Sequence, residues 1–219
     1  MNRKYRISAP QVFETAFTQS KIFQKHEWLF DVHPGKVSSF QPDVRVSFDS
    51  DAALTHGQFG HVATINRHLA THPSFVLGGD KMSLVDLEGQ TYVTMTHDDD
   101  AFLSVTSSDG AKTPLRPSRV FRANDVRAAE LAVKLKIGYS ALPDFVLDDN
   151  TNEDELSTSS LEGWKISPTY LRIISSGPPD RHLSKLHEAL MSALSPLLNT
   201  PWRSFGQTEN IIPLVNSNA

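Results

Sequence analysis

Histidine has the widest chemical range of the side chains in this sequence, because it can bind a metal ion or transfer a proton near neutral pH. Nine histidines are spread over the chain, and no two have metal-ligand spacing on an obvious helix face. His182 and His187 are five positions apart, so they do not share a helix face well. The pattern favours scattered surface or core histidines over a metal site. They are His26, His33, His56, His61, His68, His72, His97, His182 and His187.

Acidic residues gather at two places where they could bind a cation or move a proton. Residues 148–152 begin like a calcium-binding loop, but Glu153 stands where that loop needs glycine for its sharp turn. Residues 98–100 are three consecutive aspartates, which are more typical of a solvated turn, and His97 before them is the only hint of an acid–base pair. No dinucleotide-binding, P-loop, serine-hydrolase or zinc-protease motif is present. We therefore predict no catalytic residue, no metal site and no cofactor.

The composition is that of an ordinary globular protein and limits the possible partners. The 219 residues contain no cysteine, which excludes disulfides and thiolate chemistry and fits a reducing compartment. The net charge is −4 and there is no run of Lys or Arg, which argues against direct binding of duplex DNA. The first residues do not read as a signal peptide, and no apolar stretch is long enough to span a bilayer. We expect a cytoplasmic protein that does not contact a membrane.

The elements that would position these groups alternate between strands and helices. Tyr5–Ala9 reads as a strand, and Pro10 suits the first turn of a helix that continues to Lys25. The clearest periodic segment is a helix over residues 183–197, which Pro196 should end or kink. Such alternation favours parallel sheets in α/β layers. Further strands are expected at 28–32, 44–48, 67–71, 91–95, 101–106, 119–122, 137–142 and 170–174.

A second helix is expected from Asp125 to Lys136. Asn124 is its candidate N-cap, because its side chain can accept a hydrogen bond from the first turn, and Gly138 follows at the usual C-terminal position. A short helical stretch should follow Pro143. One apolar face of the second helix is expected to carry Ala128, Leu131, Ala132 and Leu135.

Four segments together resemble the effector-binding domain of LysR-type transcriptional regulators. RISAPQVFETAF (6–17) is similar to its opening strand and helix, and HPSFVLGGDKMSLVDLEGQTYV (72–93) to the entry into its second lobe. RVFRANDVRAAELAVKLKIGYSALPDFV (119–146) resembles the capped, Ala-rich helix of that lobe with its flanking strands. LRIISSGPPDRHLSKLHEALMSAL (171–194) resembles the returning strand and last helix. The resemblance covers roughly residues 5–198 and depends on the order and spacing of the segments.

The sequence departs from the family in several places. Residues 34–42 replace a short helix, the crossing around 59–72 is only loosely similar, and the tail after Pro201 matches nothing in the family. The family's DNA-binding helix-turn-helix and linker helix have no counterpart in these 219 residues. The resemblance implies that this half is supplied elsewhere or is naturally missing.

The resemblance implies a type-2 periplasmic-binding-protein fold, an α/β architecture of two Rossmann-like lobes joined by crossing strands. Lobe one would comprise residues 1–70 and 169–219, and lobe two residues 71–168. In such folds the ligand binds in the crevice at the carboxyl ends of the strands, where helix N-termini favour an anion. The residues selected by this logic are Ser8, Ala9, Pro10, Gln11, Ser38, Ser39, Thr96, His97 and Asn124.

Each of these residues also has a purely structural interpretation, which stays open. Ser8 and Asn124 could simply cap their own helices, and Pro10 could only start one. Ser38 and Ser39 could be loop residues, and His97 could stabilise the aspartate turn after it.

The resemblance implies an allosteric sensor that is not an enzyme. A small effector, with a carboxylate as one candidate, would shift the population of lobe arrangements in a homodimer. DNA would be contacted only through the missing N-terminal domain. The alternatives are a stand-alone solute-binding protein of the same fold, which should carry an export signal, an enzyme with its site in the cleft, and an interaction module with a collapsed cleft.

Overall fold

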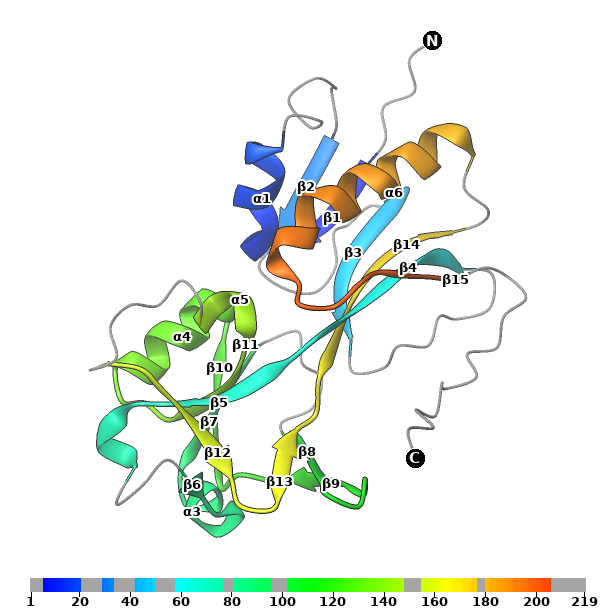
Figure 1. The fold of residues 1–219 in the computed structure, drawn as a ribbon. Coiled ribbons are helices and arrows are strands. Elements are labelled where there is room, and N and C mark those ends of the chain that lie inside the picture. The colour runs from blue at the N-terminus through cyan, green and yellow to red at the C-terminus, as the bar shows by residue number, and fades with distance from the viewer. Residues whose placement is uncertain are drawn as a thin grey trace.

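The computed structural model describes residues 6–20, 29–33, 42–49, 58–76, 81–95, 102–147, 155–176 and 180–205. These residues form two α/β lobes, each built around its own sheet, which lie one above the other in Figure 1. The upper lobe, lobe one, contains the first and last described residues. The lower lobe, lobe two, is formed by the middle of the chain.

Lobe one has a six-stranded sheet in the order β15-β4-β14-β3-β1-β2. Strand β1 is parallel to its neighbours β2 and β3, whereas β14 is antiparallel to β3 and β4. The parallel sheet expected from the sequence is therefore a mixed sheet, because β4 runs out toward lobe two and β14 runs back. The strands are β1 (Arg6–Pro10), β2 (Leu29–His33), β3 (Val44–Asp49), β4 (Gln58–Ile65), β14 (Thr169–Ser176) and β15 (Arg203–Phe205).

Lobe two has a nine-stranded sheet in the order β10-β7-β11-β5-β12-β13-β8-β9, with β6 beside β12. β10, β7 and β11 form a parallel run and β6 is parallel to β12, whereas β5 and β13 are antiparallel to their neighbours. The strands are β5 (Arg67–Thr71), β6 (Lys81–Met82), β7 (Thr91–Met95), β8 (Leu103–Ser107), β9 (Lys112–Leu115), β10 (Arg119–Ala123), β11 (Tyr139–Pro143), β12 (Ser157–Leu161) and β13 (Trp164–Ile166).

The α-helices are α1 (Glu14–Gln19), α3 (Leu84–Glu88), α4 (Val126–Lys134), α5 (Asp144–Leu147) and α6 (Arg181–Leu194), and the 3₁₀ turns are η1 (Gln11–Phe13), η2 (Pro73–Phe75) and η3 (Ser195–Leu197). The longest, α6, lies across the sheet of lobe one in Figure 1. It begins at Asp180, whose carboxylate accepts hydrogen bonds from the N–H groups of His182 and Leu183, both at 2.8 Å. It ends at Leu194, and Pro196 lies in the 3₁₀ turn that follows, as predicted.

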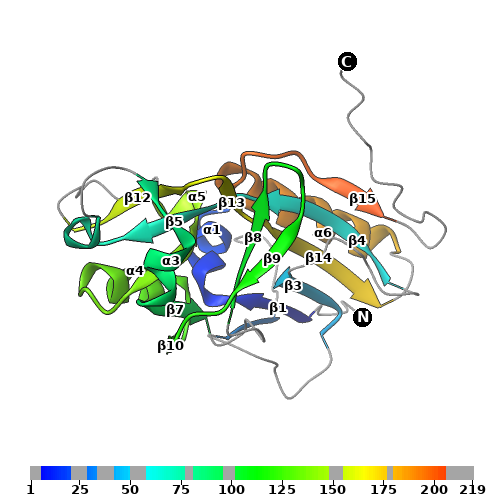
Figure 2. The same ribbon diagram turned by 90° about the horizontal axis from the view of Figure 1, so that it is seen from below.

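The chain passes between the lobes twice. Strands β4 and β5 follow each other with only Asn66 between them, and Figures 1 and 2 both show them as one nearly continuous ribbon. The return runs from β13 through Ser167 and Pro168 into β14. The first passage thus lies a few residues before position 70. The division of the chain into lobes at 70 and 168 stays a prediction.

The first helix starts later than the sequence predicted. Pro10 is the last residue of β1 and lies opposite His33 of β2, with an extended ψ of 142°. Helical conformation begins with η1 and continues in α1 only to Gln19. Pro10 therefore ends a strand instead of starting a helix. Residues 21–25, the rest of the predicted helix, lie outside the described residues.

Both predicted ends of the lobe-two helix α4 are corrected by the structure. The N-cap is Asp125, whose carboxylate accepts from the N–H of Ala128 at 2.8 Å, and Asn124 lies one residue before it. Beyond the other end, Lys136 adopts the left-handed conformation with φ 61°. Gly138 is required for a different reason, because a β-carbon there would lie 2.0 Å from the carbonyl oxygen of Thr91.

The buried face of α4 also differs from the predicted one. Val126, Ala129, Ala132 and Val133 are buried, whereas Leu131 and Leu135 are 56% and 65% exposed. Helical spacing shows which side chains share a face, but it does not show which of two apolar faces meets the sheet.

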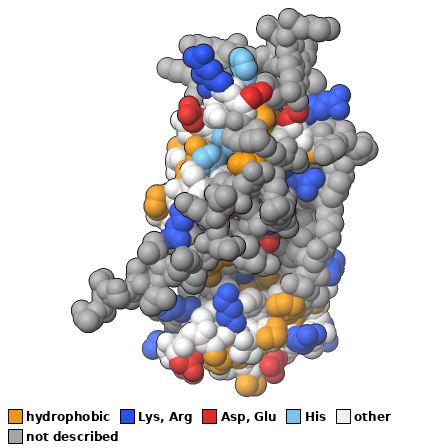
Figure 3. Space-filling view, turned by 90° about the vertical axis from the view of Figure 1, so that its right-hand side faces the viewer, with side chains coloured by type: hydrophobic (Ala, Val, Ile, Leu, Met, Phe, Trp, Pro, Cys, Tyr) orange, Lys and Arg blue, Asp and Glu red, His pale blue; other side chains and the backbone are white. Residues whose placement is uncertain are grey.

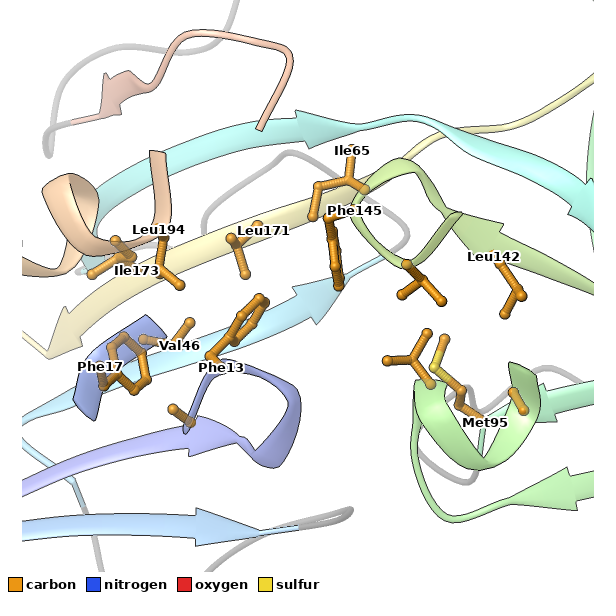
Figure 4. Close-up of a cluster of buried hydrophobic side chains, with 14 of the residues drawn as sticks. Phe13, Phe17, Val46, Ile65, Met95, Leu142, Phe145, Leu171, Ile173 and Leu194 are labelled. Carbon is orange, nitrogen blue, oxygen red and sulfur yellow. The ribbon is translucent and has the colours of Figure 1, made fainter. Parts of the chain in front are cut away.

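One apolar cluster extends through both lobes. It includes Val46 and Leu171 of lobe one together with Met95 and Leu142 of lobe two. Figure 4 shows this cluster with Phe13 and Phe145 near its middle. A second cluster, around Leu69, Leu87 and Tyr139, fills the other side of the lobe-two sheet. The lobes are therefore joined by packing as well as by the crossing strands.

Candidate functional site

The parallel strands of each lobe end at one common edge. In lobe one, Pro10 at the end of β1 lies opposite His33 at the end of β2. In lobe two, Met95 at the end of β7 lies opposite Ala123 at the end of β10. Met95 and Ala123 belong to the same apolar cluster as Phe13, three residues after β1. The carboxyl ends of the parallel strands of the two lobes therefore face each other across this cluster.

The predicted residues at the end of β1 differ in how much surface they present. Ser8 and Ala9 are buried within the strand, Pro10 is half-buried, and Gln11 is exposed at the start of η1. Gln11 is therefore the residue of this group that a ligand from solvent would meet first.

The predicted residues of lobe two follow directly from strand ends. Asn124 comes after β10 and is exposed. Thr96 and His97 come after β7 and lie outside the described residues. Because Met95 and Ala123 are opposite each other, the chain leaves both strands at the same place on the sheet edge. Ser38 and Ser39 also lie outside the described residues.

The helix starts offer less to an anion than the sequence predicted. η1 and α1 together are short, Pro10 has no N–H to donate, and Glu14 brings a negative charge into the first turn of α1. At the start of α4, the carboxylate of Asp125 already accepts from the N–H of Ala128. Neither helix start by itself explains why a carboxylate would be preferred over an uncharged ligand.

An aromatic group that was not assigned to the site lies between the two lobes. We call Phe13, Phe48 and Phe145 the aromatic bridge, because Phe13 and Phe48 belong to lobe one and Phe145 to lobe two. The ring of Phe13 lies 5.2 Å from that of Phe48 and 6.1 Å from that of Phe145, between ring centroids. Phe13 is fully buried (Figure 4). The sequence predicted Phe13 only as part of the first helix (10–25), because sequence spacing does not reveal a contact between lobes.

Polar contacts lie beside the aromatic bridge. Asp144, the first residue of α5, is 2.5 Å from Nε2 of His68 on β5 and accepts from the amide of Asn199 at 2.8 Å. The guanidinium of Arg67 donates two hydrogen bonds to the carbonyl oxygen of Ser167, at 3.0 and 2.9 Å. Arg67 and Ser167 lie on the two passages between the lobes, so this contact ties the passages together.

Two buried ionisable groups lie away from the strand ends. His187 on α6 is packed against His61 on β4, with ring centroids 5.4 Å apart, and burial lowers the pKa of His187 to about 4. Burial also lowers the pKa of His61, against an opposing effect of Glu188. In lobe two, burial raises the pKa of Tyr139 far above its usual value. These shifts reflect packing in the two cores.

The described part of the chain contains no group of three or more His, Asp or Glu side chains that could hold a metal ion. Within the same residues, no helix is both long and apolar enough to cross a membrane.

The fold and the arrangement of strand ends define a class of ligand-binding regulatory domain. The family model described as the LysR substrate binding domain matches residues 41–198, so this chain belongs to that family. Its function is therefore effector sensing in a LysR-type transcriptional regulator. No match was found among curated proteins.

Solved structures share the fold at low sequence identity. The regulatory domain of MetR from Neisseria meningitidis is 11% identical with a TM-score of 0.64, over 93% of this chain and 98% of that one. CrgA from the same organism is 13% identical with a TM-score of 0.63, over 90% of this chain and 69% of that one. The full-length virulence activator AphB of Vibrio cholerae is 14% identical with a TM-score of 0.61, over 86% and 68%. Neither the family match nor these neighbours support a solute-binding protein or a cleft enzyme.

Proposed function

We propose that this chain binds a small effector at the edge where β1, β7 and β10 end, and that it passes the signal on by a change between its two lobes. The observation that supports this most is that the ends of these strands meet in one apolar cluster. A ligand held there touches both lobes, so it can favour one lobe arrangement over another. Gln11, Thr96, His97 and Asn124 are the proposed polar contacts of the ligand.

This proposal is tested by a ligand screen with a matched pair of substitutions. Amide chemical shifts would be followed while carboxylates, amino acids and uncharged aromatic compounds are added singly. Asn124→Asp adds a negative charge with little change of shape, so it should weaken the binding of a carboxylate ligand about tenfold and that of an uncharged ligand clearly less. Ser118→Asp, an equally exposed position away from these strand ends, is the control. Ligand-induced shifts confined to other surfaces would contradict the proposed site.

The proposal includes a homodimer, for which lobe two offers an apolar face. Leu131 and Leu135 on α4 and Ile137 after it are exposed, as are Val120 and Phe121 of β10. β10 is an edge strand and contacts α4, so these side chains lie on adjoining elements. Large apolar side chains that are exposed together are typical of an interface. Val12 of η1 packs against the core and Ile22 lies outside the described residues, so neither is assigned to this interface.

The dimer is tested by light scattering over a dilution series. Leu135→Glu should shift the measured mass toward that of the monomer. In an isologous interface both copies contribute the same patch, so one substitution places two charges in the interface. Val85→Glu is the control, since Val85 on α3 is 75% exposed but lies away from α4. A wild-type protein that is monomeric at high concentration would refute the dimer for this chain.

The protein is further proposed to act in the cytoplasm and to reach DNA only through a domain outside these residues. On the face shown in Figure 3, Lys and Arg side chains are interspersed with Asp and Glu instead of forming one basic area. A salt-sensitive, sequence-specific mobility shift with this chain alone would contradict this part of the proposal.

A further inference from the structure

Helix α5 (Asp144–Leu147) has only four residues, but two of them contact residues of lobe one. It follows β11 of lobe two directly, and its first two residues, Asp144 and Phe145, both reach groups outside the lobe-two sheet. The backbone N–H of Asp144 donates to the carbonyl oxygen of Asn66, the residue between β4 and β5, at 3.3 Å. α5 is therefore anchored at the first passage between the lobes.

The carboxylate of Asp144 joins the two lobes. One oxygen is 2.5 Å from His68, just after the first passage, and the other accepts from Asn199 at 2.8 Å. Asn199 lies between η3 and β15 and is held to lobe one, because the hydroxyl of its neighbour Thr200 donates to the carbonyl of Thr64 on β4 at 2.6 Å. The Asp144 side chain is 13% exposed, whereas that of His68 is 51% exposed and Asn199 is also exposed, so solvent reaches both partners of this carboxylate.

The second contact of α5 is apolar. Phe145 is buried and its ring faces Phe13 of lobe one across 6.1 Å (Figure 4). Asp144 and Phe145 thus attach adjacent positions of one short helix to two separate segments of lobe one, near residues 13 and 199. Two attachment points resist rotation between the lobes, which a single point does not.

A further polar connection between the lobes lies at the two passages. Arg67 holds the two passages together through the carbonyl of Ser167, close to the axis about which the lobes would turn. A contact near a rotation axis changes little when the lobes rotate, whereas contacts displaced from it are made or broken. The contacts of α5 therefore help to hold the angle between the lobes, together with the apolar cluster that extends through both lobes.

We infer that α5 is a latch that holds the two lobes at the observed angle. Asp144 is its positioning residue, and the contact between Phe13 and Phe145 is its apolar part. Phe13 follows Gln11 by two residues in η1, so a ligand at Gln11 would act directly on the latch. That last step depends on the proposed function, whereas the latch itself does not.

The test measures the distance between the lobes without any ligand. The chain has no cysteine, so Lys81→Cys in lobe two and Ser192→Cys on α6, both exposed, provide a unique pair of spin labels. Lys81 belongs to β6, which lies at the lower end of lobe two in Figure 1, and Ser192 belongs to α6 of lobe one, so the pair spans both lobes. Pulsed electron resonance should give one narrow distance distribution for the otherwise wild-type protein.

Loss of the latch should produce a second, longer distance. Asp144→Ala should raise the ratio of the longer to the shorter population about tenfold, because a hydrogen bond to a charged group is lost. Asn199→Ala should act in the same direction and is exposed, so it carries the test if Asp144→Ala does not fold. Phe145→Leu, which keeps apolar volume but loses the ring contact, should add to the effect of Asn199→Ala. Asp86→Ala, which removes a carboxylate that caps only α3, is the control.

Unchanged distance distributions in Asn199→Ala and in the double variant Asn199→Ala/Phe145→Leu, with both folded, would overturn the latch. Ligand binding at the strand ends would still stand in that case, because its test uses chemical shifts and Asn124. Failure of the ligand screen would conversely leave the distance measurement untouched.

Discussion

Acidification should destabilise lobe one through a single buried histidine. His187 lies on the buried face of α6 and is 2% exposed, and its Nε2 has no hydrogen-bond partner. Protonation would place a charge in this buried position, beside the ring of His61. Burial therefore lowers the pKa of His187 to about 4, compared with 6.5 for an exposed histidine.

The size and sign of the effect follow from the difference between the folded and unfolded pKa. Above about pH 6.5, both states hold a neutral His187 and the group contributes no pH dependence. Between about pH 6.5 and 4, the unfolded chain binds a proton that the folded chain does not, so the free energy of unfolding falls as the pH falls. Each pKa unit corresponds to about 1.4 kcal/mol, so the loss should approach about 3 kcal/mol near pH 4.

Urea denaturation at intervals from pH 7.5 to 4.5 measures this loss. His187→Phe keeps an aromatic ring but removes the titration, so its free energy of unfolding should fall by about 2 kcal/mol less than that of the wild type over this range. His182→Phe, an exposed position on the same helix, is the matched control and should retain the wild-type dependence. The reasoning would be refuted if His187→Phe and wild type lost the same free energy of unfolding between pH 7.5 and 4.5.

Two further predictions concern the flanks of α4 and use urea denaturation at pH 7.5. Gly138→Ala should lower the free energy of unfolding by about 2–3 kcal/mol, because its β-carbon would collide with the backbone of Thr91, whereas Gly89→Ala meets open space and should be nearly neutral. Equal effects of these two substitutions would contradict the close approach of β11 to β7. Asp125→Ala should cost about 1 kcal/mol through loss of the N-cap, and Asn124→Ala clearly less. A larger loss for Asn124→Ala would restore Asn124 as the cap.

Much of the local structure could be predicted because it depends on neighbouring residues. The strand at 44–48, the end of α6 before Pro196 and the short helix after Pro143 all follow from side-chain periodicity or from the fixed backbone of proline. β15 was not expected, because three residues of mixed polarity carry no periodic signal. β4 was missed because Gly60 and His61 interrupt the alternation of apolar side chains along it.

For both the N-cap and the buried face of α4, the sequence left two possibilities and did not select between them. Asn124 and Asp125 are both good caps, and the choice between them depends on where β10 ends. Likewise, α4 has apolar side chains on two faces, and the sheet of lobe two covers only one of them. Where the sequence allows two local arrangements of similar stability, tertiary packing selects one of them.

The sequence by itself determined the family, the α/β class and the segments that end near the proposed ligand, because these depend on the order and spacing of local elements. Only the tertiary structure decided which side chains join the lobes. Asp144 contacts His68, 76 positions away in the sequence, and Asn199, 55 positions away. Phe145 contacts Phe13, which lies near the start of the chain. Contacts over such separations leave no periodic trace in one sequence, since they depend on how two sheets are oriented after each has formed.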